Sequence, residues 1–352
     1  MPEHQMRAIM FSPRWRKVIG DLRATGGRIT MMVLTIAVGI FGVGTILNAY
    51  TILTREISRN YLGTNPASAQ LEIDRVDDSL VEAVRLRPGI ADAEASSAVV
   101  ARIEKKHGEW MPALLFVIKN FNKMRINTFQ PESGAWPPLD GSILLEREAL
   151  PLINAKVGDS CRIQTPNGQK HEISISGLVH DPGLAPAWQE QTVYGYITPS
   201  TLTWLGEGST MHILKVTVKN QPLNVTAIEQ TIVDLAVWLK QQGYKVGEIR
   251  IPPPGKHPHQ TQMMAILILL LIFGILAMML SAILTATVIG GILAQQIRQI
   301  GVMKAIGART RQIAGLYLVL VILMGIAAVI LGLPPGIAAG RGFARIVAQL
   351  LN

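Results

Sequence analysis

Several residues of this 352-residue sequence have side chains that act as nucleophiles or general bases in other proteins. His180 and Asp181 are adjacent and could form part of a catalytic pair. No G-x-S-x-G motif or other positioned nucleophile accompanies them, and the Pro-Gly pair that follows favours a turn. Cys161 is the only cysteine. It lies in a strand-like run with Arg162 as its one cationic neighbour, so a catalytic thiolate is disfavoured.

Metal and nucleotide chemistry have equally little support. His257 and His259 have the spacing of two metal ligands on a strand, but they flank Pro258 in a proline-rich connector, which favours solvated side chains. A single cysteine excludes an intramolecular disulfide and a CxxC metal site. No G-x-x-x-x-G-K-[ST] motif occurs, so the chain does not bind ATP through a P-loop. We therefore expect a chain that is not an enzyme and has no metal or cofactor of its own, any ATP being bound by a partner subunit.

The stretch with the clearest chemical character is a basic segment, residues 294–313, which contains no acidic residue. Its apolar residues recur at helical spacing while its basic residues point elsewhere, which predicts a short amphipathic helix at a membrane surface. The apolar set is Ile297, Ile300, Met303 and Ile306, and the basic set is Arg298, Lys304, Arg309 and Arg311. The alternative is a positively charged tether that only fixes topology.

The composition predicts an integral membrane protein. The hydrophobic fraction is 49%, the mean hydropathy is +0.31 and the formal net charge is +9, a combination that is unusual for a soluble enzyme. The basic residues cluster beside the ends of apolar segments, where the positive-inside rule accounts for them without nucleic acid as a partner.

Hydropathy divides the chain into seven segments. A basic amphipathic segment at the N-terminus is expected in the cytoplasm, followed by a first span long enough to cross a bilayer. A cleaved signal peptide is the disfavoured alternative for that run, because the run is too long. The expected segments are 1–28 (cytoplasmic), 29–53 (first span), 54–262 (extracytoplasmic domain), 263–293 (second span), 294–313 (cytoplasmic loop), 314–335 (third span, ended by Pro334-Pro335-Gly336) and 336–352 (extracytoplasmic).

The region 54–262 has the texture of a water-soluble domain. Its opening and closing parts alternate strand and helix patterns, which predicts an α+β fold. The last helix, residues 225–242, places Ile228, Ile232, Leu235 and Leu239 on its inner face. Short strands around Gly-rich turns in the middle predict a small β-barrel-like insert at about 134–200. The expected fold class is thus an α-helical integral membrane protein with a large extracytoplasmic α+β domain that contains this insert.

One part of the sequence resembles a known family. The string from Ile300 to Ala308, followed by Arg309 to Ile313, resembles the hallmark of FtsX-like permeases. These are the membrane subunits of the mechanotransmitting ABC transporters related to the macrolide exporter and the lipoprotein-release complex. The order of the segments is also similar, and Leu144-Leu145 and Ala155 to Asp159 are similar to the small β subdomain of that family's extracytoplasmic module.

The resemblance implies a non-catalytic, multi-pass permease subunit of the cell (inner or plasma) membrane, with its N-terminus in the cytoplasm. Its implied partners are a cytoplasmic ABC ATPase, a second copy or a second permease half, and membrane lipid; a periplasmic adaptor protein is also compatible. The basic helix would be the coupling helix that docks on the ATPase. The implied docking residues are Arg298, Gln299, Ile300, Gly301, Met303, Lys304, Ile306, Gly307, Arg309 and Arg311.

The sequence departs from the family in two ways. Gln299 stands where the family commonly has Glu. The family's membrane unit has four spans and only three are expected here, so we expect a fragment or the first unit of a longer permease.

Three functions remain open from the sequence. The first is export or extraction of a lipophilic or peptide cargo, driven by the ATPase. The second is an FtsX-type signalling complex that regulates an extracellular partner, such as a cell-wall hydrolase, without transport. The third is a membrane-anchored structural or sensor module without an ATPase.

Overall fold

The structure is a computed structural model, and it describes residues 26–105, 108–257 and 260–350. The predicted cytoplasmic segment 1–28 therefore lies outside the described residues except for its last three. The chain divides into two compact units. The first consists of Met1–Thr54 and Gln262–Val347, and the second of Arg55–Thr261 and Ala348–Asn352.

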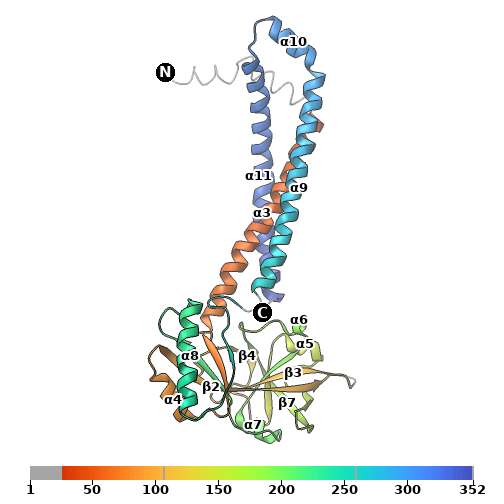
Figure 1. Cartoon of the computed structure of the whole chain (residues 1–352). Helices are drawn as coiled ribbons and strands as arrows, with labels where there is room; N and C mark the ends of the chain where they lie inside the picture. The colour runs from red at the N-terminus through yellow and green to blue at the C-terminus, as the bar shows by residue number, and fades with distance from the viewer. Residues whose placement is uncertain (1–25, 106–107, 258–259, 351–352) are drawn as a thin grey trace, which may run out of the picture. The chain divides into compact units, whose positions relative to one another are not determined.

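The first unit is built from three long apolar helices (Figure 1). Each contains a window that is apolar and long enough to cross a membrane, at Ile29–Gly63, Met264–Gln295 and Thr310–Val347. All three are longer than the predicted spans. Their bounds are α3 Gly26–Gly63, α9 Gln260–Gln295 and α11 Thr310–Leu350, with the short helix α10 Ile297–Ala305 between α9 and α11.

The expected stop at Pro334-Pro335-Gly336 is wrong, because α11 continues through both prolines to Leu350. A proline removes a backbone donor, but a transmembrane helix tolerates it where a neighbouring helix compensates. Just beyond the prolines, Asn48 Nδ2 of α3 donates to the Ile337 carbonyl over 3.0 Å, so the two helices are hydrogen-bonded there. Residues 336–350 are therefore a helical continuation of the third apolar helix.

Small residues on α11 bring it into backbone contact with α3. A Cβ on Gly332 would lie 2.4 Å from the Ala37 carbonyl oxygen, and one on Gly340 would lie 2.6 Å from the Thr45 oxygen. These glycines belong to a stripe of small residues spaced four apart, the pattern that allows two membrane helices to approach closely. The stripe is Ala328, Gly332, Gly336, Gly340 and Ala344, whose two alanines are buried.

The second unit contains ten strands in one sheet with the order β10-β1-β9-β2-β3-β8-β5-β7-β4, and β6 pairs with β2 and β7. The sequence pattern predicts strands at Ala69–Ile73 and Val193–Ile197, and these bounds are confirmed as β1 and β8. The strands are β1 Ala69–Ile73, β2 Ile90–Glu104, β3 Trp110–Val117, β4 Gln130–Gly134, β5 Ser142–Glu146, β6 Ser160–Gln164, β7 Lys170–His180, β8 Val193–Ile197, β9 Ile213–Val218 and β10 Val246–Arg250.

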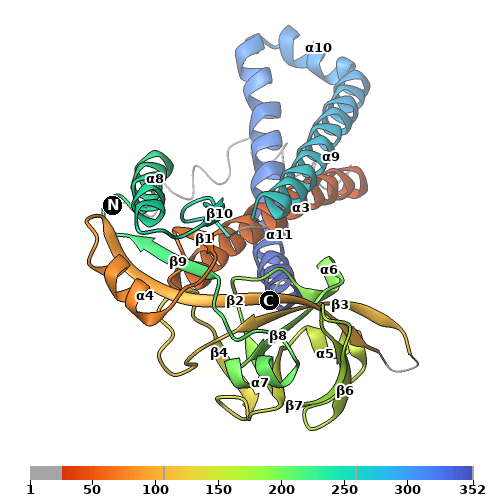
Figure 2. The same cartoon turned by 60° about the horizontal axis from the view of Figure 1, so that its bottom comes forward.

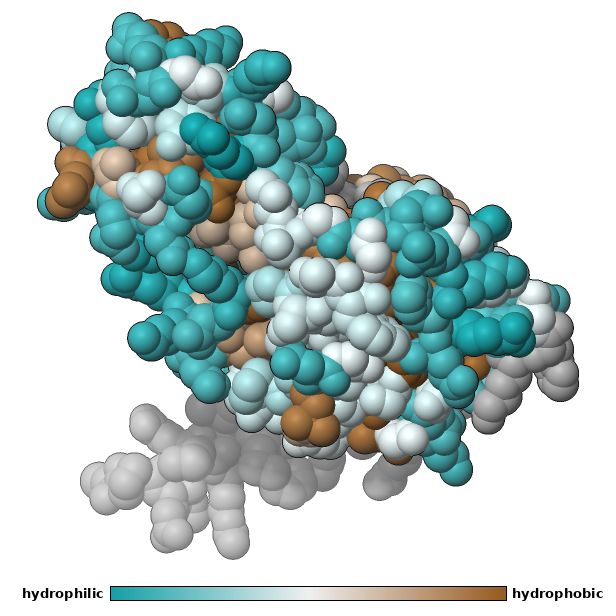
Figure 3. Space-filling view, turned by 90° about the horizontal axis from the view of Figure 1, so that it is seen from below, coloured by the Kyte–Doolittle hydropathy of each residue, from teal (hydrophilic) through white to brown (hydrophobic). Residues whose placement is uncertain are grey.

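Five helices belong to this unit: α4 Asp78–Arg85, α5 Ala149–Ile153, α6 Ala187–Glu190, α7 Pro199–Trp204 and α8 Val225–Gln241. Helices α4 and α8 lie beside β1 and β9 (Figure 2) and share one hydrophobic core with them. The predicted inner face of α8 is confirmed, because Ile228, Ile232, Leu235 and Leu239 are all buried. The face of this unit that Figure 3 shows is mainly hydrophilic, with isolated apolar residues.

The middle of the second unit is a ring of strand pairs. The pairings run β2–β3, β3–β8, β8–β5, β5–β7, β7–β6 and β6–β2. Two of these strands, β2 and β3, precede residue 134. The strands of the expected insert are thus joined to the rest of the sheet, and a separate small β-barrel at 134–200 stays a prediction.

Candidate functional site

The basic segment 294–313 forms a helix, α10, held between the ends of two apolar helices. Helix α9 ends at Gln295 and α10 begins at Ile297, so only Gln296 separates them. The Gln296 N–H still bonds within α9, to the carbonyls of Ile292 and Leu293 at 3.1 Å each. Its side chain accepts from the Tyr317 hydroxyl of α11 over 2.5 Å. The bend before α10 is therefore tied to both neighbouring helices.

The C-terminus of α10 is a Schellman motif. The Gly307 N–H bonds to the Lys304 carbonyl at 3.0 Å, and the Ala308 N–H bonds to the Met303 carbonyl at 2.9 Å. Gly307 has φ +96, a backbone conformation that a residue without Cβ adopts at no steric cost. This conformation explains why a glycine suits position 307, which lies in the string that resembles the hallmark of FtsX-like permeases.

Helix α11 starts immediately afterwards with a side-chain cap. The Arg309 N–H donates to Gln312 Oε1 over 3.0 Å, which is the return half of a capping box. This bond puts the cap at Arg309, one residue before the first residue of α11, Thr310. Three residues, from Ile306 to Ala308, therefore separate the end of α10 from this cap. The C-terminus of α10 and the N-terminus of α11 each have a defined hydrogen-bonding pattern.

No residue of α10 is fully buried, and its apolar residues divide into two sets. Ile300 and Met303 are half-buried. In contrast, Val302 is 55% exposed and Ile306 is 82% exposed. Arg298, Val302 and Ile306 are spaced four apart, so they lie along one side of the helix. Val302 and Ile306 therefore form an exposed apolar row next to Arg298.

The structure brings all ten predicted docking residues into one short region. The half-buried members are Ile300 and Met303, and the exposed members are Arg298, Gln299, Gly301, Lys304, Ile306, Gly307, Arg309 and Arg311. Ile297 is 66% exposed and lies next to Ile300 on α10, away from the row that Val302 and Ile306 form. Val302, at a spacing of four from both Arg298 and Ile306, was not among the residues named from the sequence. The assignment of these residues to a docking site stays a prediction.

A second set of contacts joins the end of α3 to the second unit. We call residues Thr64–Ala67 and Arg125–Thr128 the clasp. The Asn127 N–H donates to the Asn65 carbonyl at 3.0 Å and the Thr128 N–H to the Thr64 carbonyl at 2.8 Å. Asn65 Nδ2 donates to the Arg125 carbonyl at 2.6 Å. The chain that leaves α3 is thus hydrogen-bonded along several residues to the loop after β3.

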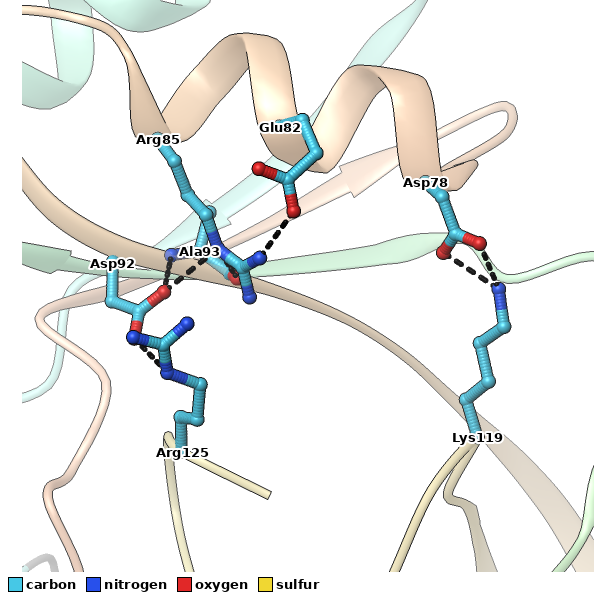
Figure 4. Close-up of polar contacts among 7 residues, drawn as sticks. All are labelled: Asp78, Glu82, Arg85, Asp92, Ala93, Lys119 and Arg125. Atoms are coloured by element: carbon cyan, nitrogen blue, oxygen red, sulfur yellow. Dashed lines mark hydrogen bonds and ion pairs between the residues drawn. The ribbon is translucent and has the colours of Figure 1, made fainter. Parts of the chain in front are cut away.

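That loop is fixed to the sheet by charge. Asp92 of β2 accepts from Arg85 Nε of α4 at 2.9 Å and pairs with Arg125 Nε at 2.8 Å (Figure 4). The Asp92 side chain is only 13% exposed, so these contacts are stronger than those of a surface pair. Glu94 Oε2 also accepts from the N–H groups of Arg125 and Ile126.

The same loop is anchored on its other side by aromatic packing. The Phe129 ring centroid lies 4.3 Å from that of Tyr196, and the Phe121 centroid lies 5.2 Å from that of Trp136. Together with the Asp92 contacts, this packing ties the clasp to both β2 and β8.

The residues considered for enzyme chemistry lie on β6 and at the end of β7. Asp181 lies in the turn after β7, and Tyr196 donates to its Oδ2 over 2.7 Å. Burial raises the pKa of Asp181. Burial, followed by the charge of Glu172, raises the pKa of Cys161 to about 12, so this thiol is protonated at neutral pH. Within the described part of the chain, no group of three or more His, Cys, Asp or Glu could hold a metal ion.

Comparison with known proteins finds one family match, in the C-terminal part of the chain. Residues 271–351, which include α10, match the family model described as FtsX-like permease C-terminal. No match was found among curated protein sequences.

Three solved structures are similar to this chain at low identity. The periplasmic region of MacB from Actinobacillus actinomycetemcomitans is 14% identical, with a TM-score of 0.33, covering 55% of this chain and 94% of that one. The extracellular domain of the noncanonic ABC-type transporter YknZ from Gram-positive bacteria is 10% identical, with a TM-score of 0.33 and coverages of 51% and 100%. A domain of a putative permease from Porphyromonas gingivalis is 12% identical, with a TM-score of 0.31 and coverages of 53% and 92%.

Proposed function

We propose that this chain, which is an FtsX-like permease over residues 271–351, passes ATP-driven motion of a cytoplasmic ABC ATPase across the membrane to its sheet-rich domain. The ATPase docks on α10. The motion serves export or extraction of a lipophilic or peptide cargo. The observation that carries the proposal is the exposed row Arg298, Val302 and Ile306, on a helix held at both ends by apolar helices within the matched segment.

The geometry of α10 suits a docking element. Its N-terminal bend is bonded to α11 through Gln296 and Tyr317, and its C-terminus is closed by the Schellman motif at Gly307. A helix held in this way moves with α9 and α11, because the connections at its two ends are short and hydrogen-bonded. The segment 294–313 carries Arg298, Lys304, Arg309 and Arg311 and no acidic residue. By the positive-inside rule, this charge favours a cytoplasmic position for α10.

The route into the second unit starts at α3. This helix is continuous from Gly26 to Gly63, so its last turns already belong to the second unit. The clasp then bonds Thr64–Ala67 to the loop that Asp92 and Glu94 hold on β2. The other connection, after β10, contains Pro252-Pro253-Pro254-Gly255, which is a semi-rigid spacer, and its His257 ring packs edge-on against Tyr61 at the end of α3. We assign α3 as the lever, because it is a continuous helix that leads directly into the clasp.

Affinity purification from membranes with matched variants tests the docking assignment. Val302→Asp and Ile306→Asp place a charge in the exposed row, and a buried charge at an interface centre costs at least about 2 kcal/mol. We expect recovery of a P-loop ATPase to fall by about 30-fold or more. Ile297→Asp makes the same chemical change on another side of α10 and should leave recovery unchanged. Equal recovery from the Ile306→Asp variant and the unsubstituted chain would reject the docking site.

A second assay separates export from regulation of an extracellular partner. With the ATPase bound, clasp variants should stop the extracytoplasmic output and leave ATP hydrolysis in place. If that output is efflux of an apolar compound or peptide, the export reading holds. A cell-wall defect without any change in efflux would favour the FtsX-type signalling alternative.

A further inference from the structure

A groove of about 820 Å³ lies between α3 and α9 in the first unit. Its walls are mainly apolar, with Met31 and Met32 on α3 and Leu284 and Val288 on α9. Gly27 and Gly291 line the end near α10, where the absence of side chains leaves the groove open. None of these residues belongs to the docking surface on α10.

The threonines of the groove do not offer polar recognition. Thr35 donates its hydroxyl proton to the Met31 carbonyl, Thr285 to the Ser281 carbonyl and Thr287 to the Ile283 carbonyl, at 2.7 to 2.9 Å. Each hydroxyl group is thus satisfied within its own helix. The occupant that fits such a wall is a hydrocarbon chain, because a polar ligand would find few partners there.

The length of the groove fits one lipid chain. On α9 the lining residues run from Leu284 to Gln295, which is about 16 Å of helix. One leaflet of the hydrocarbon core is about 15 Å thick. The groove therefore matches one leaflet, the leaflet on the α10 side.

Charge at the end of the groove selects the headgroup. Gln295 is the last lining residue, and Arg298 follows three positions later. The basic residues of the loop have no acidic neighbours in sequence, because no Asp or Glu follows Glu248. Basic residues beside a membrane helix attract anionic lipid at about 1 kcal/mol per residue.

We infer that this groove between α3 and α9 binds one acyl chain of an anionic phospholipid from the leaflet on the α10 side. Such a chain fills the space that Gly27 and Gly291 leave between the two helices. Methionine side chains adapt to a mobile chain of this kind, since they are unbranched and polarisable. This site does not depend on the ATPase, so it can be tested on the chain alone.

Photolabelling of the purified full-length chain provides the test. The chain is placed in bilayers that contain phosphatidylglycerol with a diazirine on one acyl chain, and labelled peptides are mapped by mass spectrometry. We expect labelling of Met31, Met32 and residues 284–295 to exceed labelling around Phe273, which is 60% exposed on the same helix. Phosphatidylcholine with the same chain should label the groove several-fold less.

Two neighbouring glycines give a matched pair of variants. A Cβ added at Gly290 or at Gly291 meets nothing within 4 Å, but only Gly291 lines the groove. Gly291→Leu should reduce groove labelling several-fold, and Gly290→Leu should not. Circular dichroism of both variants checks that the helices are intact.

Equal labelling in the two variants would overturn the lipid site, as would groove labelling no higher than that at Phe273. Equal labelling by the two lipids would overturn the anionic headgroup. A Gly291→Cys variant that forms a disulfide-linked dimer through this position would show that a second copy occupies the groove, and would also overturn the proposal. Loss of ATPase copurification in the docking experiment would leave these results untouched.

Discussion

The contact between α3 and α11 gives a prediction whose sign depends on position. In an isolated helix, Gly→Ala is favourable by up to about 1 kcal/mol. At Gly332, however, the added Cβ would lie 2.4 Å from the Ala37 carbonyl oxygen, about 1 Å closer than an ordinary contact. The obstacle is backbone, so α11 must move away from α3. Overpacking of this kind costs about 1–3 kcal/mol.

We therefore expect Gly332→Ala to lower the free energy of unfolding of the helical unit by about 1–2 kcal/mol. The control is Gly325→Ala on the same helix, where a Cβ meets nothing within 4 Å, so that variant should be neutral or slightly stabilised. Unfolding is followed by circular dichroism during SDS titration in mixed micelles. A Gly332→Ala variant as stable as Gly325→Ala would refute the backbone-to-backbone packing of α3 and α11.

Three further predictions concern other parts of the chain. Gly307→Ala forces a residue with a Cβ into the left-handed backbone conformation, which should lower the local free energy of unfolding by about 1–2 kcal/mol. Amide hydrogen exchange at residues 307 and 308 should therefore speed up by about tenfold. Unchanged exchange would contradict the Schellman motif. Cys161, with a pKa of about 12, is protonated and buried at pH 7–8, so a maleimide should label it only after unfolding, and fast labelling of the folded chain would be inconsistent with this burial. Asp92→Ala removes the acceptor of two charged hydrogen bonds, worth about 1.5–3 kcal/mol each, and should expose the loop around Arg125 to trypsin; equal digestion of the variant and the unsubstituted chain would show that the clasp is held by other contacts.

Local patterns explain why parts of the fold were predictable. Strands β1 and β8 and helix α8 each have an apolar pattern that matches the period of the element, and their predicted and observed bounds agree closely. Strand β4 was missed because all five of its residues are exposed, so no apolar alternation marks it. The prolines of α11 misled the prediction because a proline pair usually ends a helix, whereas α11 continues through both to Leu350.

In the candidate site, too, local patterns were predictable from the sequence and contacts between distant segments were not. The helical spacing and the basic character of residues 294–313 identified α10, and the family string drew attention to Gly307. Helical spacing alone does not tell which apolar residues of α10 are exposed, and Val302, which is 55% exposed, was not among the residues named from it. The clasp joins Asn65 to Arg125 across 60 residues. Hydrogen bonds between such distant loops leave no periodic signal in the sequence.

Site-specific photocrosslinking in living cells tests the central claim most directly. A photoreactive amino acid is placed at Val302 or Ile306 on the exposed row of α10, or at Phe273 on α9 as the control, and the adducts are identified by mass spectrometry. We predict an adduct with a P-loop ATPase from positions 302 and 306 and none from 273. The absence of an ATPase adduct from both α10 positions, in cells where the chain is present in the membrane, would contradict the assignment of α10 as the docking helix.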